Sequence, residues 1–259
     1  MSILGTRVLR TEDPALLTEG GMYVDDLAPD GALHATFVRS VMAHAEIGGI
    51  DTAEAESMPG VVAIFTAESL GLQALPPSMG MLNQEMLRTW LASDRVRYVG
   101  EPVALIISET AEQGVDAVES VIVDYEPLDA VVDMRDAAKG DTLLFPDVGS
   151  NVAFAIPGKV DDEFWDGCDV RVTLSFRNQR LSGAPIEPRA CTSVWSTDAD
   201  GNESLTQWST TQNAHGTRSS LATAMGIEED QIRVICPPCL LYTSPSPRDA
   251  TLSRMPSSA

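Results

Sequence analysis

The segment Trp208-Ser-Thr-Thr-Gln-Asn-Ala-His215 places an uncharged amide, Gln212, between a β-rich run and a segment with helical spacing. A carboxamide donates hydrogen bonds without adding charge. At a helix N-terminus it also lies beside a partial positive charge, which favours an anionic ligand. Gln212 is therefore our candidate for binding a ligand just outside the backbone. The alternative is that it caps its own helix, which Gln does less well than Ser or Asp.

The sequence contains four cysteines, two of which form the CxxC pair Cys236-Pro-Pro-Cys239. A zinc site would need a second pair of ligands at suitable spacing, and the sequence offers none. A redox pair belongs at a helix N-terminus, whereas this one follows a predicted strand at 232–235. We expect no function for the pair.

Two other groups of polar residues invite a functional interpretation. Glu187 and Arg189 lie in Gly183-Ala-Pro-Ile-Glu-Pro-Arg-Ala190, where we expect an ion pair that shapes a turn in preference to proton transfer. His44 and His215 are isolated, and lone histidines are more often structural than metal ligands. We name no metal ligand among these residues.

The hydrophobic pattern predicts a mixed α/β (α+β) chain. Residues 1–18 have little periodicity and are expected to form an extended arm. The apolar run 61–65 is typical of a buried strand. A strand, helix and strand over 103–125 favour an α/β unit, with a right-handed crossover if its strands are parallel. The other elements expected in this half are strands at 33–40 and 96–99, a short helix at 51–58, and a loop or weak helix at 71–92.

A second section follows turn-rich residues 138–150. The alternating run 170–176 predicts a strand with one buried face. Two further strands flank Asp198-Ala-Asp-Gly-Asn202, which is the strongest hairpin signal in the sequence. A helix is expected at 213–225, with Leu221, Ala222 and Met225 facing inward and Gly226 ending it.

Composition excludes several classes of protein. The 17 Lys and Arg residues against 38 Asp and Glu give a formal charge of −21, which disfavours nucleic-acid and anionic-lipid partners. No apolar run approaches the roughly 20 residues of a membrane span. The first ten residues lack the apolar core and cleavage site of a secretion signal, so we expect a cytoplasmic protein.

Several motifs in a fixed order resemble the molybdopterin-binding large subunits of the xanthine dehydrogenase, aldehyde oxidase and aerobic carbon monoxide dehydrogenase family. No single motif is specific, but their order and spacing together are. They are Arg10-Thr-Glu-Asp-Pro-Ala-Leu-Leu-Thr18, Tyr23-Val-Asp-Asp26, Arg39-Ser-Val-Met-Ala-His-Ala45, Pro59-Gly-Val61, Val96-Arg-Tyr-Val-Gly-Glu-Pro-Val-Ala104, Val123-Asp-Tyr-Glu-Pro-Leu128, Ile186-Glu-Pro-Arg-Ala190 and Thr211-Gln-Asn-Ala-His215.

The resemblance implies a hammerhead-like α/β domain followed by the start of a molybdenum cofactor-binding domain. It also implies oxidation of a small substrate with water-derived oxygen, on a molybdenum–molybdopterin cofactor that takes the cytosine dinucleotide form in bacteria. In the family the residue equivalent to Gln212 faces an oxo ligand of molybdenum. Electrons then pass to iron–sulfur clusters and FAD on partner subunits, an iron–sulfur small subunit and an FAD-binding medium subunit, so a hetero-oligomer is expected.

The resemblance divides the chain into an N-terminal arm at 1–18, a hammerhead-like domain at 19–135 and the beginning of a cofactor domain at 136–237. From Pro238 to Ala259 the family's glycine-rich loop is replaced by a Pro- and Ser-rich sequence without periodicity. We expect residues 238–259 to be a non-native, disordered tail. The family's catalytic Glu and its other pterin loops would lie beyond this point, so we assign no catalytic residue and expect an inactive N-terminal fragment.

Two functions remain open at this point. One is the N-terminal part of a molybdenum hydroxylase large subunit acting on carbon monoxide, an aldehyde or an N-heterocycle. The other is a non-catalytic, acidic assembly or binding module that shares the fold.

Overall fold

A computed structural model of the chain describes residues 13–18, 20, 23–75, 77, 79–156, 162–178 and 187–237. They form two compact units, one made of Gly31–Thr173 and the other of the described residues in 1–30 and from Leu174 onward. Residues 238–259, which were predicted to be non-native, lie outside the described residues and include Cys239 of the CxxC pair. The predicted domain boundaries at residues 18, 135 and 237 stay predictions.

The unit 31–173 contains two three-stranded sheets in which all strand pairs are antiparallel. The first sheet has the order β1 (His34–Arg39), β5 (Pro102–Ser108), β3 (Val61–Thr66). The second has the order β4 (Arg95–Val96), β2 (Ala45–Asp51), β6 (Ile122–Pro127). The helical elements are α2 (Ala53–Glu56), α3 (Ala67–Leu70), α4 (Ala111–Glu119), α5 (Met134–Lys139), η2 (Pro146–Val148) and η3 (Asp162–Trp165).

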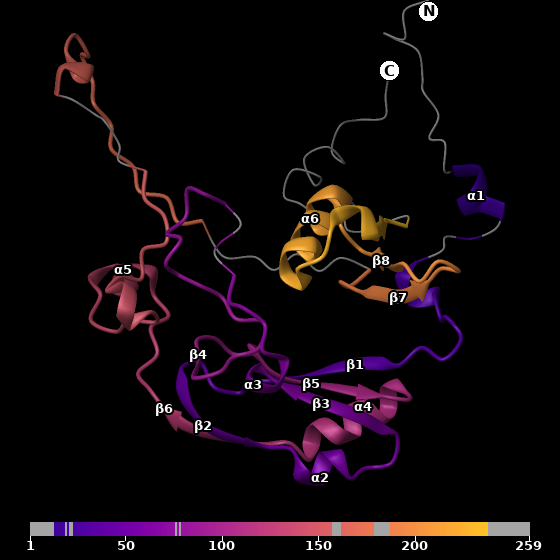
Figure 1. Cartoon of the computed structure of the whole chain (residues 1–259). Helices are drawn as coiled ribbons and strands as arrows, with labels where there is room; N and C mark the ends of the chain where they lie inside the picture. The colour runs from indigo at the N-terminus through magenta and orange to yellow at the C-terminus, as the bar shows by residue number, and fades with distance from the viewer. Residues whose placement is uncertain are drawn as a thin grey trace, which may run out of the picture. The chain divides into compact units, whose positions relative to one another are not determined.

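Helix α4 packs on the β1-β5-β3 sheet (Figure 1). Thr110 caps its N-terminus by accepting a hydrogen bond from the Gln113 backbone, and the Gln113 side chain accepts one from the Thr110 backbone in return. Gly114 and Ala117 are the buried residues of the helix, so small residues let it approach the sheet closely. The buried core beneath it includes Val103 and Ile106 of β5.

Two predictions about this unit need correction. Strands β5 and β6, which flank α4 in sequence, lie in different sheets, so they form no parallel crossover unit. Strand β2 was not predicted, because Gly48 and Gly49 interrupt its apolar alternation. The pairing of β2 with β6 also shifts in register between Ile47 and Gly49. Such a β-bulge breaks the period of two on which strand prediction relies.

Burial corrects two further predictions. The run 170–176 forms no strand among the described residues, and its apolar side chains are exposed, with Phe176 at 88%. Alternation therefore identified a segment that can form a strand but pairs with no strand among the described residues. In β3 the predicted full burial is wrong for Val62, which is 54% exposed because one face of the strand is open. The remaining strands and helices predicted for the unit are present, although β4 and α2 are shorter than expected.

The second unit contains a three-stranded sheet with the order β7 (Cys191–Thr197), β8 (Glu203–Ser209), β9 (Ile232–Ile235). Strands β7 and β8 form the predicted antiparallel hairpin, and β8 and β9 are parallel. Helix α6 (Ala214–Met225) connects the parallel pair, with the short η4 (Glu229–Gln231) before β9. Figure 1 shows α6 beside the β7–β8 hairpin.

The core of this unit is small. Leu205, Ala222 and Ile232 are its buried residues, with Leu221 packed against them. Met225 is 42% exposed, so its predicted inward orientation is wrong. The N-terminal residues contribute η1 (Val24–Asp26), which contacts β7, and the helix α1 (Asp13–Thr18), which replaces the extended conformation expected there. Among the described residues no helix has the length and apolar character needed to cross a membrane.

His44 has the structural role predicted for it. The side chain is 4% exposed, and Nδ1 lies 2.7 Å from the backbone oxygen of Asp129. A carbonyl oxygen only accepts, so Nδ1 carries the proton in this contact. The backbone oxygen of His44 also accepts a hydrogen bond from Leu128. Both contacts fasten the start of β2 to the segment that follows β6.

Replacing Gly114 by Ala should destabilise the protein. A Cβ at this position would clash with Thr36 Oγ1 and lie 2.7 Å from Ser108 Oγ, so the helix or these side chains must shift. We expect the free energy of unfolding in urea to fall by about 1–3 kcal/mol, although Ala alone favours a helix over Gly by about 1 kcal/mol. Asp116→Ala, on the exposed face of the same helix, should change it by less than about 0.5 kcal/mol. Equal or greater stability of Gly114→Ala would show that the close approach is absent.

Candidate functional site

Gln212 lies at the strand-to-helix junction predicted for it. Strand β8 ends at Ser209 and α6 begins after its N-cap residue Asn213. The β8–α6–β9 connection is the parallel unit of this fold, and ligands of such units bind outside the carboxyl ends of the strands. The position of Gln212 is therefore the one at which a bound group would be expected.

Thr210 ties the start of β7 to the end of β8. Its hydroxyl accepts a hydrogen bond from the Ala190 backbone N–H at 2.9 Å and lies 3.3 Å from the Ala190 oxygen. The Thr210 backbone N–H donates to the same Ala190 oxygen at 3.1 Å. Thr210 is only 8% exposed, so these bonds are shielded from water. They bring the segment that contains Arg189 to the edge of the sheet where Gln212 lies.

Short polar side chains fix the loop between Thr210 and α6. The carboxamide oxygen of Asn213 accepts a hydrogen bond from the Gly216 backbone at 2.9 Å, which caps α6. The hydroxyl of Thr211 accepts one from the Asn213 backbone at 3.1 Å and lies 3.1 Å from the hydroxyl of Thr217. Asn213, and not Gln212, is therefore the capping residue, which removes the alternative role considered for Gln212.

Cys236 connects this loop to the end of β9. Its thiol donates to the Thr211 backbone oxygen at 2.8 Å. The loops that follow the two parallel strands are thereby joined directly behind Gln212. The Cys236 thiol therefore has a structural contact, while Cys239 lies outside the described residues and the expectation of no function for the pair stays a prediction.

The Gln212 side chain is exposed and makes no hydrogen bond to any residue that the structure describes. It lines an open depression of about 790 Å³ at the edge of the sheet. The other residues that line the depression are Arg189, Ala190, Cys191, Gln207, Ser209, Thr210, Thr211, Asn213 and Thr217. Thr211 and Asn213, on either side of Gln212, are engaged with the backbone, whereas the Gln212 carboxamide is free to bind a ligand.

The electrostatics of this depression differ from those of the whole chain. None of the described residues that line it is Asp or Glu, and one is a cation, Arg189, although the chain carries a formal charge of −21. Helix α6 has no acidic residue in its first turn, so its partial positive charge is not neutralised there. The depression is therefore suited to an anionic group.

The ion pair predicted between Glu187 and Arg189 is absent. Arg189 is exposed and forms no ion pair or hydrogen bond with the described part of the chain. Glu187 is 8% exposed, so the two side chains are in different environments. The Glu-Pro-Arg turn instead leaves the guanidinium available at the depression, a role that we did not predict. The Thr210–Ala190 contact was also missed, since no sequence pattern reports a bond between residues 20 positions apart.

The thiol and histidine groups near Gln212 offer no alternative chemistry. Burial of the sulfur raises the pKa of the Cys191 thiol above its usual value, even though the residue as a whole is exposed. The thiol therefore stays protonated and is a poor nucleophile. His215 is exposed on the first turn of α6. Across the described residues, no three His, Cys, Asp or Glu side chains lie close enough to hold a metal ion.

Two family models match consecutive parts of the chain. The hammerhead domain of aldehyde oxidase and xanthine dehydrogenase matches residues 18–129. The molybdopterin cofactor-binding domain matches residues 144–239, which include Gln212.

Curated relatives match over most of the chain. The nicotine 6-hydroxylase large subunit of Paenarthrobacter nicotinovorans is 36% identical over 244 residues, 91% of this chain and 29% of that protein. The carbon monoxide dehydrogenase large chain of Afipia carboxidovorans is 32% identical, over 90% of this chain and 30% of that one. The chain therefore spans about 30% of the length of these relatives.

Solved structures share the fold. Quinoline 2-oxidoreductase from Pseudomonas putida matches with a TM-score of 0.77 and 29% identity, over 90% of this chain and 30% of that one. Carbon monoxide dehydrogenase from Oligotropha carboxidovorans matches with a TM-score of 0.76 and 32% identity, with the same coverage of 90% and 30%.

Replacing Thr210 by Val should destabilise the sheet that carries Gln212. The change keeps the side-chain shape but removes the acceptor for the Ala190 N–H. Leaving that donor unsatisfied should lower the free energy of unfolding by about 1–3 kcal/mol. Thr206→Val is the matched control, because Thr206 is half-buried on β8 and its hydroxyl has no partner in the described part of the chain. Urea denaturation would contradict the assignment if both variants lost the same stability.

Proposed function

The chain belongs to the xanthine dehydrogenase and aldehyde oxidase family of molybdopterin-binding oxidoreductases, and we propose that it is the N-terminal part of the large subunit of such an enzyme. In this proposal the residues up to about 135 form the hammerhead domain and the β7–β8–β9 unit begins the cofactor domain. Gln212 is the residue that contacts the cofactor.

One observation carries the proposal. In a chain with a formal charge of −21, the single depression that contains Gln212 is lined by no carboxylate and by one arginine. A bare divalent cation would be bound by carboxylates or clustered imidazoles and thiolates. A molybdenum–molybdopterin cofactor, whose phosphate and dithiolene groups are anionic, fits amide, hydroxyl and guanidinium donors instead. The residues present therefore fit this group.

When bound, the cofactor supplies the redox chemistry of the family. The chain's own residues position it. The Gln212 carboxamide donates a hydrogen bond to an acceptor atom of the cofactor and adds no charge beside it. Thr210, Asn213 and Cys236 keep the Gln212 backbone in place through the contacts described above. Because the loop is already fixed, little conformational entropy is lost when the carboxamide binds.

The finer assignments are part of the proposal. Names of relatives such as "large subunit" and "complex subunit gamma" support a hetero-oligomer, with iron–sulfur and FAD groups on small and medium partner subunits. The substrate is a small molecule, carbon monoxide, an aldehyde or an N-heterocycle. We further propose the cytosine dinucleotide form of the cofactor and a cytoplasmic location.

The role of Gln212 is tested in a chimera. Residues 18–237 of this chain replace the corresponding part of the nicotine 6-hydroxylase large subunit of Paenarthrobacter nicotinovorans. Loss of one preorganised donor next to a reacting centre costs about 10²–10³-fold in kcat. We expect Gln212→Ala to lose that much turnover of nicotine while the molybdenum content per subunit stays unchanged.

Gln73→Ala removes a carboxamide of the same size that is exposed, lies outside the depression and has no hydrogen-bond partner among the described residues, so it is the matched control. It should keep kcat within about twofold of the unsubstituted chimera, since exposed substitutions away from the site have small effects. Full turnover of Gln212→Ala with a full complement of molybdenum would refute the proposed contact. A chimera that folds but holds no molybdenum would count against the cofactor role of this segment.

A further inference from the structure

The edge of β2 that faces β4 is unpaired over most of its length. On the other side β2 pairs with β6 from Ala45 to Asp51. On the β4 side it pairs only at Ala45 and Glu46, followed by one hydrogen bond from the Ile47 N–H to the Asp94 oxygen. Residues 48–51 therefore have no strand partner on this side in the described part of the chain. An open strand edge presents backbone donors and acceptors that can pair with another strand.

The segment before β4 explains why the edge is open. The Ala92 N–H donates to the Pro102 oxygen at 2.8 Å, so this segment turns away from β2 towards β5 in the other sheet. Strand β2 meanwhile stays paired with β6. Strand β2 and the segment before β4 therefore diverge beyond Glu46 and leave a wedge-shaped space between them.

A hollow of about 420 Å³ fills this wedge. Four consecutive residues of β2, from Ile47 to Ile50, line it. Successive side chains of a strand point to opposite faces, so a hollow that touches all four meets the strand at its edge. Gly48 and Gly49 are both exposed, and a Cβ at Gly49 would meet no atom within 4 Å. Another backbone can therefore approach β2 closely here.

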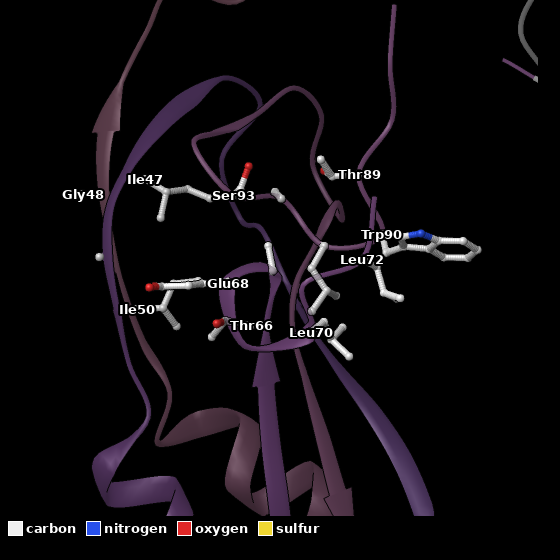
Figure 2. A pocket seen from close by; sticks show the side chains of 14 residues that line it. Ile47, Gly48, Ile50, Thr66, Glu68, Leu70, Leu72, Thr89, Trp90 and Ser93 are labelled. Carbon is white, nitrogen blue, oxygen red and sulfur yellow. The ribbon is translucent and has the colours of Figure 1, made fainter. Parts of the chain in front are cut away.

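The opposite wall of the hollow combines apolar side chains with one charge and the hydroxyls of Thr66, Thr89 and Ser93. Figure 2 shows Leu70 and Leu72 on this side, and Glu68 pointing from α3 towards β2. Leu72 is 42% exposed and Trp90, also on the wall, is 41% exposed, so apolar surface is left open to solvent. Glu68 is the only charged residue that lines the hollow, and it has no ion-pair partner among the residues described. The chain as a whole is strongly acidic, with a formal charge of −21.

We propose that this hollow binds an extended segment of a partner protein, which adds to the edge of β2 at residues 48–51 and carries alternating aliphatic and basic side chains. The backbone of that segment pairs with β2. Its aliphatic side chains enter the hollow against Leu70 and Leu72, and a basic side chain faces Glu68. Charge complementarity favours a basic segment over an acidic one, because both Glu68 and the chain's net charge repel acidic residues. This inference does not depend on the proposed function.

The test uses the whole chain and a blocked, fluorescent heptapeptide of alternating Lys and Val, with binding followed by fluorescence anisotropy. A second peptide has the same sequence with N-methylated backbone amides at alternate positions, on the edge that would face β2. Loss of the backbone hydrogen bonds should weaken binding more than tenfold. Hydrogen exchange should slow at residues 48–51 when the unmethylated peptide is added. Equal affinity of the two peptides, or no binding of either, would overturn the proposal.

Two variants test the side-chain contacts. Glu68→Gln should weaken binding of the Lys–Val peptide about two- to fivefold, and the difference should shrink at high salt. Glu54→Gln removes an exposed acidic residue of α2 outside the hollow and should leave binding unchanged. Equal effects of the two variants would mean that only net charge attracts the peptide, which contradicts the assigned site.

A second copy of the chain is the competing occupant. Sedimentation of the chain without peptide tests for it. Dimer formation accompanied by slowed exchange at residues 48–51 would assign the edge to self-association and would overturn the proposal. A monomer whose residues 48–51 exchange rapidly until the peptide is added supports it.

Discussion

The arrangement around Gln212 depends on one set of hydrogen bonds, those between Thr210 and Ala190. Three contacts between these two residues hold the start of β7 against the end of β8. The loop that follows is then fixed by the Asn213 cap and by the thiol of Cys236. Each of these groups satisfies a backbone donor or acceptor. The Gln212 carboxamide takes no part in these bonds and has no hydrogen-bond partner among the residues that the structure describes.

The two units differ in how their strands are paired and packed. In the unit 31–173, two small antiparallel sheets share one core, and α4 reaches the first sheet only because Gly114 has no side chain. The segment before β4 cannot pair with both sheets where they separate. At Ala92 it bonds to the start of β5, and the edge of β2 is left open as a consequence. In the other unit, a parallel strand pair with its connecting helix provides the edge at which Gln212 is displayed.

Sequence analysis succeeded where the signal is local. The helix within 103–125 and the helix at 213–225, with Gly226 after it, were predicted from residue spacing over a few positions, and both are present. It failed where the outcome depends on distant partners. Alternation in 170–176 predicts a strand, but among the described residues no neighbouring strand pairs with it.

The same contrast holds for strand β2 and for the site. Strand β2 was missed because glycines and a bulge interrupt its pattern, and its pairing with β6 and β4 reveals it. The position of Gln212 followed from the strand-to-helix junction. The freedom of Arg189 and the Thr210–Ala190 tie did not, because both are set by three-dimensional contacts.

The central claim is that the Gln212 carboxamide forms no hydrogen bond with the part of its own chain that the structure describes. The direct test is NMR of its side-chain amide in the ¹³C,¹⁵N-labelled chain. The account predicts rapid exchange of both amide protons with water and no scalar coupling across a hydrogen bond to a backbone carbonyl carbon. Slow exchange, with a coupling across a hydrogen bond to a backbone carbonyl, would contradict it.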